Sequence, residues 1–333
     1  MEGTILITGA TGSLAIQAIQ QILSSYPSAT IVGTVRNGNA TPKSPQVLQL
    51  EEIILRHGTS KSLIKNVDLN SITEVREFAN EIAGMVQSKK LPPIRAVICN
   101  AFTWSLNGQQ FSRDRFESTF QVNHLAHFLL VLKLVRSMDR ETGRILMISS
   151  EVHDPDNVNP LSKLGAGLPA HDDYDRLIKP GPDKVGSEHD MGWQRYANSK
   201  LANVMFMQSL NRRLAETSEF NKITVTAMNP GGLVDSRAHD AQRLINRILF
   251  AISAFLLPII SLFTSKLRTS ANSARDVVAL AVNQEFASRR GYFDGRTPQS
   301  PARASKDWEE CEALWKASWQ WTGMEDAETC ISP

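Results

Sequence analysis

Short runs of apolar, mostly β-branched residues alternate along the chain with longer stretches in which apolar residues recur every three or four positions. The short runs predict strands at 4–8, 30–35, 63–67, 94–99, 144–149 and 223–228. They are apolar almost without interruption, as in a parallel sheet that is covered on both faces. The longer stretches predict helices at 14–23, 45–57, 73–87, 111–138, 195–215 and 271–283. The alternation predicts an α/β fold: a single doubly wound (Rossmann) parallel sheet of about seven strands, with helices on both faces.

Two segments interrupt this alternation. Residues 151–192 are rich in proline and glycine, carry more acidic than basic side chains and predict a surface insertion. Residues 248–263, ILFAISAFLLPIISLF, contain no charge and hold Pro258 in their middle. They are shorter than the ~20 residues that span a bilayer. We favour a helical lid over an apolar substrate, at about 237–267, over a patch that rests on a membrane surface.

Near the end of the chain, Trp308, Cys311, Trp315 and Trp319 recur at intervals of three or four positions. On a helix these side chains share one face, which predicts a helix packed on the core. The chain has no internal repeat and shows no second core, so we expect residues 1–333 to form a single domain.

The candidate chemistry begins after the first predicted strand, in the sequence TGATGSLA at 8–15. A glycine-rich turn between a strand and a helix lets the backbone approach a diphosphate and points unpaired helix N–H groups at it. Arg36 ends the second predicted strand, where its planar cation would pair with the 2′-phosphate of NADP. Asp68 follows the third strand, and two roles stay open for it: contact with the adenine amine, or capping of the next helix.

Polar residues also follow or interrupt apolar segments further along. The sequence CNAF at 99–102 ends the fourth predicted strand, where small residues let the backbone lie against the adenine ribose. Asn123 lies in an apolar helical stretch, where an unbonded amide is costly, so it should either stabilise a kink or hold a water. We interpret His124 and His127 as packed or solvated histidines rather than metal ligands, and expect no metal site.

Ser150 ends the fifth predicted strand, and Tyr196 and Lys200 stand one helical turn apart in YANSK. An ammonium near a phenol favours the phenolate and depresses the phenol pKa. Such a phenol can exchange a proton with a carbonyl oxygen while hydride moves at carbon, and a serine hydroxyl can hold that oxygen. With the glycine turn upstream, this arrangement predicts an oxidoreductase site.

Together these motifs resemble the short-chain dehydrogenase/reductase family over essentially the whole chain. TGATGSLA resembles its cofactor turn, CNAF its NNAG-like stretch and VNHLAHFLL its structural-asparagine helix. ISS, YANSK and NPGGLVDS resemble its catalytic serine, its Tyr/Lys pair and its proline–glycine loop. The closer resemblance, through SEVHDP and the insertion, is to the branch of retinol dehydrogenases and protochlorophyllide-reductase-like enzymes, including fungal specialised-metabolism members. Phe102 stands where that family usually has glycine.

The resemblance implies a role for each matching position. Asn123, Ser150, Tyr196 and Lys200 would form the catalytic tetrad, with Tyr196 as acid and base and Asn123 positioning a relay water. Lys200 would hold the nicotinamide ribose, and the loop from Pro230 would meet the carboxamide. NADP(H) would be the cofactor, with contacts from Gly9, Thr11, Gly12, Ser13, Leu14, Arg36, Asp68, Leu69, Asn100, Ala101, Tyr196, Lys200, Pro230, Gly231 and Val234.

Composition narrows the classes of function. The 36 Lys and Arg against 34 Asp and Glu leave a net charge of +2, so the chain has no cationic surplus for nucleic acid. Apolar residues make up 42% of the 333 residues, which excludes a disordered or fibrous chain. The 3 cysteines show no paired spacing, and no signal sequence precedes the first strand. Both features predict a cytoplasmic protein with reduced thiols.

We therefore expect an NADPH-dependent oxidoreductase that reduces a ketone, or oxidises the alcohol, of a hydrophobic small molecule such as a secondary metabolite. Two alternatives stay open. One is C=C reduction, isomerisation or cyclisation in the same pocket, and the other is a non-catalytic NADP-binding sensor. The expected partner is the small-molecule substrate, and both a monomer and a homodimer stay open.

Overall fold

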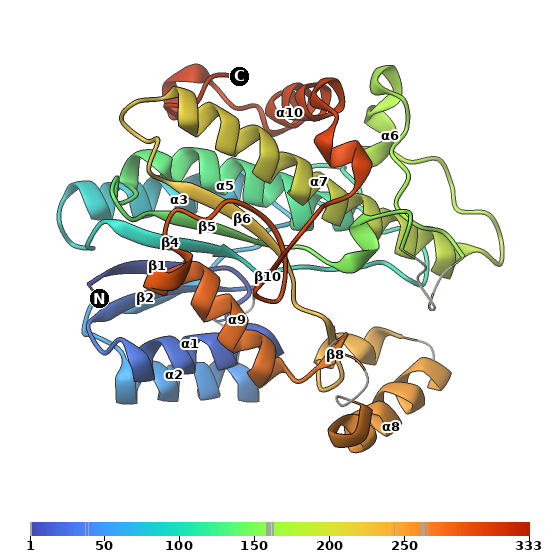
Figure 1. The fold of residues 1–333 in the computed structure, drawn as a ribbon, viewed down its shortest axis with the longest axis horizontal. Coiled ribbons are helices and arrows are strands. Elements are labelled where there is room, and N and C mark those ends of the chain that lie inside the picture. The colour runs from blue at the N-terminus through green and yellow to red at the C-terminus, as the bar shows by residue number, and fades with distance from the viewer. Residues whose placement is uncertain are drawn as a thin grey trace.

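The frame of the protein is an eight-stranded sheet with the order β10-β9-β6-β5-β4-β1-β2-β3 (Figure 1). The computed structural model describes residues 2–36, 38, 40–157, 161, 163–242, 244–260, 264 and 266–333, with 241, 244, 245 and 247 described by backbone alone. The strands are β1 (Gly3–Ile7), β2 (Ala29–Val35), β3 (Leu63–Asn66), β4 (Ile94–Cys99), β5 (Arg144–Ile148), β6 (Thr224–Asn229), β9 (Gly291–Asp294) and β10 (Thr297–Gln299). All neighbours pair in parallel except β10, which is antiparallel to β9.

The strand order reverses between β1 and β4, because the chain first builds toward β3 and then returns to add β4 on the other side. In an open α/β sheet, ligands bind in the crevice outside the carboxyl ends of the strands at such a reversal. A small parallel pair, β7 (Gly232–Leu233) with β8 (Leu267–Arg268), follows the end of β6.

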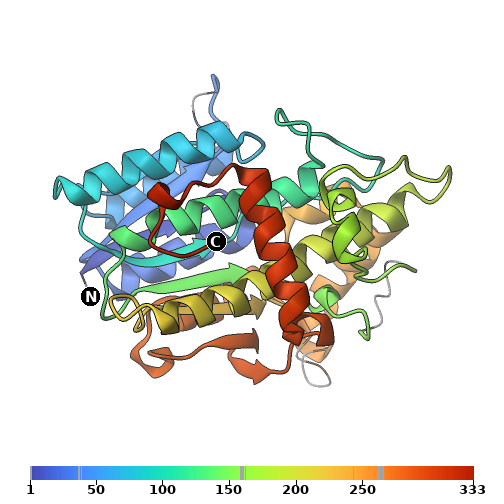
Figure 2. The ribbon, with the colours of Figure 1, turned by 90° about the horizontal axis from the view of Figure 1, so that it is seen from above.

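Helices cover both faces of the sheet (Figures 1 and 2). One layer holds α1 (Ser13–Ser25), α2 (Pro45–His57) and α9 (Ser270–Val282), and the other holds α3 (Ile72–Gln87), α5 (Ala126–Leu134) and α7 (Glu188–Glu216). The helix α10 (Trp308–Thr322) packs over α7 and α5. The shorter helices are α4 (Ser118–Phe120) and α6 (Asp175–Ile178).

Alternation along the strands explains why their sequences are apolar throughout. Leu6 belongs to the apolar cluster under α3 and α5, whereas its neighbours Ile5 and Ile7 belong to the cluster under α1 and α9. Because successive side chains point to opposite faces, odd-numbered and even-numbered positions of a strand must both be apolar when both faces are covered.

Helix ends follow local capping chemistry. The Ser44 hydroxyl accepts the N–H of Val47 at 3.3 Å at the start of α2, and Pro45 occupies the first turn. Asp307 caps α10, which ends at Gly323 with φ 58°.

The structure confirms the doubly wound fold and corrects several predicted elements. The predicted helix at 111–138 begins only at 118, because Phe111 pairs with Glu117 in an isolated bridge before it. The helix predicted from 195 begins at Glu188, so the last five positions of the predicted insertion 151–192 are helical. Positions 158–160 and 162 of that insertion lie outside the described residues. The edge strands β9 and β10 were not predicted, since they are too short for a periodic signal.

The charge-free segment forms α8 (Leu244–Ile260), which contains Pro258. Positions 261–263 of the predicted stretch lie outside the described residues. In the part of the chain that the structure describes, no helix is both long and apolar enough to cross a membrane. One face of α8 carries exposed apolar side chains, from Ile248, Leu249, Ile252, Phe255, Leu256 and Ile259.

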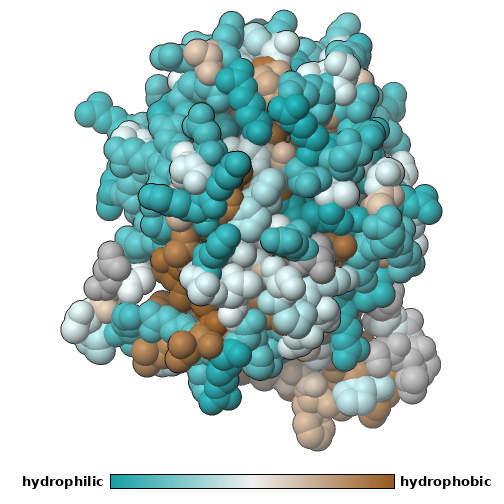
Figure 3. All heavy atoms as spheres, turned by 90° about the vertical axis from the view of Figure 1, so that its left-hand side faces the viewer, coloured by the Kyte–Doolittle hydropathy of each residue, from teal (hydrophilic) through white to brown (hydrophobic). Residues whose placement is uncertain are grey.

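Figure 3 shows the side of the molecule that holds the amino ends of the strands, where hydrophobic side chains gather in the lower part and the upper part is mainly hydrophilic.

The C-terminal helix packs largely as predicted. Cys311 and Trp315 are buried, and Trp319 is partly buried against the same cluster. Trp308, at the first turn, is instead 36% exposed and lies under the guanidinium of Arg212, 3.7 Å from its ring centroid.

Candidate active site

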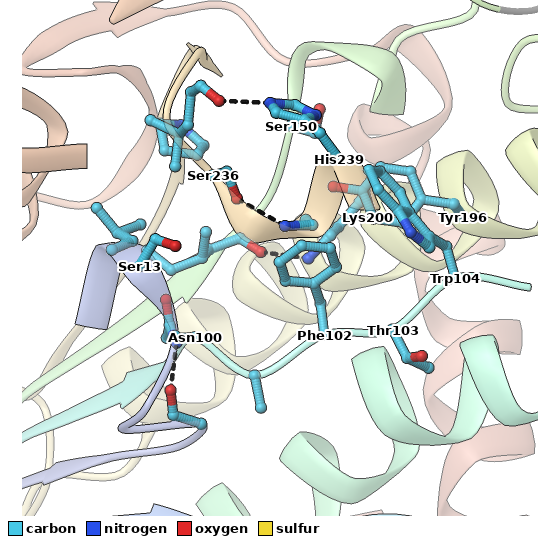
Figure 4. Close-up of a pocket in the computed structure, with 18 of the residues that line it drawn as sticks. Ser13, Asn100, Phe102, Thr103, Trp104, Ser150, Tyr196, Lys200, Ser236 and His239 are labelled. Atoms are coloured by element: carbon cyan, nitrogen blue, oxygen red, sulfur yellow. Dashed lines mark hydrogen bonds between the residues drawn. The ribbon is translucent and has the colours of Figure 1, made fainter. Parts of the chain in front are cut away.

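A cavity of about 780 Å³ opens at the carboxyl ends of β1, β2, β4, β5 and β6. It runs from the glycine turn after β1, past the ends of β4 and β5, to the inner side of α8. Figure 4 shows side chains from these separate segments gathered around it. This is the crevice where the strand order reverses.

The glycine turn forms one end of the cavity. Gly9 has φ +64°, and a Cβ on it would lie 3.0 Å from the Cα of Ala101. A Cβ on Gly12 would lie 3.1 Å from the carbonyl oxygen of Gly9. The side chain of Asn100 fixes the turn by donating to the carbonyl of Thr8 at 2.9 Å. The turn therefore leaves bare backbone facing the cavity, which only glycine can provide.

Helix α1 starts directly from this turn without a side-chain cap and without an acidic residue in its first turn. Its first N–H groups therefore have no intrahelical acceptor, and the helix dipole adds partial positive charge there. Bare backbone and free N–H groups together suit a diphosphate.

Arg36 and Asp68 line the same end of the cavity. Arg36 is exposed and makes no hydrogen bond or ion pair with any described residue, so its guanidinium is available to an anion. Asp68 accepts the N–H of Asn70 at 3.0 Å, while Ser71 caps α3. The capping role considered for Asp68 is therefore wrong.

The Tyr/Lys pair lies at the other end, on α7. Tyr196 and Ser150 both line the cavity, and the Ser150 hydroxyl is close enough to the Tyr196 phenol to lower its pKa. Lys200 lies one turn further along, with its Nζ 5.4 Å from the Tyr196 ring centroid, and donates to the carbonyl of Ile148 at 2.9 Å. The tyrosine, the serine and the lysine thus meet at the end of β5.

Burial controls the acidity of this pair. Burial raises the pKa of Tyr196 above its usual value, and the nearby Ser150 hydroxyl opposes that shift. Burial also lowers the pKa of Lys200 to about 7, because the ammonium loses its hydration. The spacing of Tyr196 and Lys200 predicted a depressed phenol pKa. In the protein alone, burial is the largest influence on that pKa, and it raises it.

Phe102 helps to bury the lysine. Its ring centroid is 5.4 Å from Lys200 Nζ and 5.9 Å from the Tyr196 ring centroid. The ring itself is 39% exposed within the cavity. A residue that replaces the usual glycine of the resembling family therefore covers the amine with an aromatic face.

Asn123 does not line the cavity. It lies in a π-helical turn, Gln121–Leu125, that joins α4 to α5. Its amide oxygen accepts the N–H of Thr103 at 2.8 Å, and its amide nitrogen donates to Thr103 O at 3.0 Å and to Ser199 Oγ at 2.9 Å. The side chain is buried and both its oxygen and its nitrogen have partners, so it positions the segment after β4. Of the two roles considered for Asn123, the structure supports the bend in the helix.

The neighbouring histidines are internal. Thr8 Oγ1 and the carbonyl of Asn123 both contact the ring of His127, at 2.9 Å and 3.0 Å. His124 lies 2.8 Å from Ser318 Oγ. Burial lowers the pKa of His124 to about 3 and that of His127 to about 4, so both are neutral near pH 7. Both are packed, as their sequence context predicts.

The loop after β6 forms one side of the site. The Asn229 amide oxygen accepts the N–H of Gly231 at 3.0 Å, and the carbonyl of Pro230 accepts the hydroxyl of Ser273. Gly231 has φ +79°, and a Cβ there would lie 3.0 Å from Arg268 Cδ. Val234 is buried behind the loop and does not line the cavity.

Comparison with known proteins gives the family. A model described as short chain dehydrogenase matches residues 3–158, and a model described as the AcuH dehydrogenase domain matches residues 237–331. The short-chain dehydrogenase iccH of Talaromyces variabilis is 28% identical over 369 residues, covering 99% of this chain and 98% of that protein. The chain belongs to the short-chain dehydrogenase/reductase family.

Other members of the family are similar over less of the chain. Human retinol dehydrogenase 13 is 29% identical over 272 residues, covering 78% of this chain and 69% of that protein. The solved structure of the angucycline C-6 ketoreductase LanV with bound NADP has a TM-score of 0.60 at 18% identity, covering 88% of this chain and 93% of that chain. This short-chain dehydrogenase/reductase is therefore an oxidoreductase of a family that binds a nicotinamide cofactor, and LanV shares its fold.

The cavity unites nearly all residues predicted for the site of this dehydrogenase/reductase. Among the predicted residues, Asn123 and Val234 alone do not line it. Bare backbone at Gly9 and Gly12 and the guanidinium of Arg36, which has no partner among the described residues, fit a phosphorylated dinucleotide. Whether each residue acts as the family comparison implies stays a prediction.

Sequence reasoning missed a second group of residues that line the cavity. They come from the segment after β4, from α7, from the segment between β7 and α8 and from α8 itself, and they include Trp104, Trp193, His239, Gln242 and Phe250. Trp193 had a detectable signal, because it precedes Tyr196 by three positions and shares its helix face. His239, Gln242 and Phe250 lie within the lid predicted at about 237–267, although they were not named one by one, whereas Trp104 had no local signal.

Proposed function

We propose that the protein is an NADPH-dependent reductase of a ketone on a hydrophobic small molecule. The observation that carries this proposal is the phenol of Tyr196, which shares the wall of the cavity with Ser150 and lies one helical turn from Lys200. The apolar residues around that end, from α8 and the segment after β4, favour a hydrophobic substrate.

NADPH is favoured over NADH because Arg36 presents its guanidinium at the end of β2 with no described partner. A planar guanidinium suits a 2′-phosphate, whereas an acidic residue at this position would suit the ribose hydroxyls of NAD. LanV, with a similar fold, has bound NADP.

The residues of the chain would act in a defined order. The hydroxyls of Ser150 and Tyr196 hold the substrate carbonyl oxygen and orient its carbon toward the cofactor. When bound, NADPH supplies hydride to that carbon and leaves as NADP⁺. The phenol of Tyr196 then delivers its proton to the oxygen, which becomes the alcohol, and regains one from solvent. One ketone, one NADPH and one proton thus yield one alcohol and one NADP⁺.

Lys200 would support this proton transfer. Its ammonium, where protonated, attracts the phenolate that forms as Tyr196 gives up its proton. The position of its Nζ beneath the Phe102 and Tyr196 rings keeps that attraction in a poorly solvated site.

The test is loss of NADPH absorbance with a panel of hydrophobic ketones, with the products identified by mass and proton NMR. Tyr196→Phe should reduce turnover by about a hundredfold to ten-thousandfold, because it removes the proton donor but keeps the ring. Tyr26→Phe is the matched control, since the Tyr26 hydroxyl bonds Asn283 away from the cavity.

Three results would overturn the proposal. If Tyr196→Phe retained wild-type turnover, the phenol would not be the acid. A product reduced at C=C would indicate an alkene reductase instead. Tight NADPH binding without consumption on any ketone or aldehyde would indicate a sensor.

A further inference from the structure

The substrate end of the cavity is lined by a cluster of four aromatic rings, here called the aromatic wall: Phe102, Trp104, Trp193 and Tyr196. Trp104 is its centre, with ring centroids at 5.6 Å from Phe102, 5.2 Å from Trp193 and 5.3 Å from Tyr196. The remaining contacts, Phe102 with Tyr196 and Trp193 with Tyr196, are 5.9 Å and 5.6 Å. The proton donor is therefore itself part of an aromatic surface.

The local backbone aims two of these rings at the cavity. Phe102 and Trp104 flank Thr103, whose N–H and C=O are both held by Asn123. In an extended segment alternate side chains point to the same side, and Figure 4 shows Phe102 and Trp104 beside Tyr196 while Thr103 points away from it. The wall is therefore held in place by a buried amide rather than by loose loop packing.

A second flat surface, from another part of the chain, lines the same cavity. The ring of His239 stacks on Phe250 with centroids 3.5 Å apart and an angle of 11° between planes. His239 Nε2 lies 2.6 Å from the carbonyl of Leu233, which can only accept, so Nε2 carries the proton and the ring is fixed. Both rings line the cavity.

Polar atoms without partners stand beside these flat surfaces. Trp193 is 5% exposed and Gln242 is 6% exposed, and Trp193 Nε1 and Gln242 Nε2 have no acceptor among the described residues. His239 Nδ1, an acceptor in this tautomer, likewise has no described donor. All three atoms are enclosed by the protein and expose almost no surface to the cavity.

We propose that the substrate is a planar, fused-ring aromatic ketone, bound between the aromatic wall and the His239–Phe250 pair. The proposal rests on the ketone reductase function above and narrows its substrate class. Aromatic faces bind flat conjugated rings through offset or edge-to-face contacts that a saturated ring cannot make. A saturated skeleton of equal size would have only the general apolar contact.

The experiment compares α-tetralone with its saturated analogue α-decalone, which has the same bicyclic skeleton without the aromatic ring. The value of kcat/KM should be about threefold to tenfold higher for α-tetralone. Trp104→Leu should abolish that ratio by lowering only the tetralone value. Trp104→Phe keeps an aromatic ring and should retain most of the ratio between the two kcat/KM values. Trp308→Leu, which removes a tryptophan outside the cavity, should leave the ratio unchanged.

Equal or better turnover of α-decalone, or an unchanged ratio in a folded Trp104→Leu variant, would overturn the proposed substrate class.

Failure of this proposal can be separated from failure of the reductase function. Binding of the two ketones to Tyr196→Phe with NADP⁺ present is measured by quenching of tryptophan fluorescence, which needs no turnover. Preferential binding of α-tetralone to that variant, with no ketone reduced by the unmodified protein, would retain the aromatic site and overturn the reductase. Reduction of both ketones with no aromatic preference would retain the reductase function and overturn the aromatic site.

Discussion

The two ends of the cavity are built in different ways. At the end near β1, backbone at Gly9 and Gly12 and the uncapped start of α1 form the centre, and the side chains of Arg36 and Asp68 lie beside them. The end near α7 is formed by side chains, among them Trp104, Trp193 and Tyr196. A ligand shared by a whole family can be held by backbone, whereas a ligand particular to one member has to be selected by side chains.

The difference also appears in how far apart the contributing residues lie in sequence. The glycine turn is one short segment, TGATGSLA. The aromatic wall and the His239–Phe250 pair join residues from positions 102 to 250, brought together by the sheet and by α7. We therefore expect mutations at the first end to affect mainly the cofactor and mutations at the second end mainly the substrate.

Lys200 lies beside the proposed proton donor, so its replacement should have the largest effect. Lys200→Met should lower turnover by about a hundredfold to ten-thousandfold, since it removes the charge that favours the phenolate. Burial lowers the pKa of Lys200 to about 7 from its ordinary 10.5, so the unfolded chain binds more protons between these values. Stability contributed by this group should therefore rise as pH increases from about 7 toward 10.5.

In Lys200→Met that pH-dependent rise should disappear, and the variant should unfold at a higher temperature than the wild type at pH 7. Thermal unfolding followed by circular dichroism across this pH range measures both effects. A wild-type stability that falls steadily over the range would contradict a buried, easily deprotonated lysine.

Arg36 should affect the cofactor end alone. Arg36→Leu should weaken NADPH binding by about tenfold to a hundredfold and leave NADH binding unchanged, because a charge-assisted contact with the 2′-phosphate is lost. Fluorescence titration gives both dissociation constants. Arg56→Leu, an exposed arginine on α2 that pairs with Glu52, is the matched control. Equal weakening of NADPH binding and NADH binding would show that Arg36 does not contact the 2′-phosphate.

Replacement of Gly9 should show most directly that cofactor binding depends on a position without a side chain. Gly9→Ala should weaken binding of both NADPH and NADH by about tenfold and lower stability by about 1–3 kcal/mol, because φ is +64° and the new Cβ meets Ala101. Gly84→Ala, where a Cβ on α3 meets nothing within 4 Å, should raise stability by about 0.5–1 kcal/mol and leave binding unchanged. Cofactor titration and denaturant unfolding of the two variants make the comparison, and similar behaviour of both would refute it.

Much of the frame followed from local pattern. The helix Pro45–His57 and the strand Ile94–Cys99 were predicted with the bounds that the structure shows. The predictions were wrong where tertiary contacts decide: α7 begins at Glu188, and β9 and β10 join the sheet edge from a region with little periodicity. A short strand at an edge gains its stability from its neighbour rather than from its own sequence.

By itself, the sequence determined the doubly wound frame, the glycine turn, and the tyrosine and lysine one helical turn apart, because these depend on periodicity and on spacing within one element. Only the tertiary structure decided that Asn123 anchors Thr103, that Phe102 covers Lys200, and that burial raises the pKa of Tyr196. It also decided which aromatic rings surround the proton donor. Those features depend on distances between segments far apart in the chain and on the exclusion of water, and neither is encoded by local spacing.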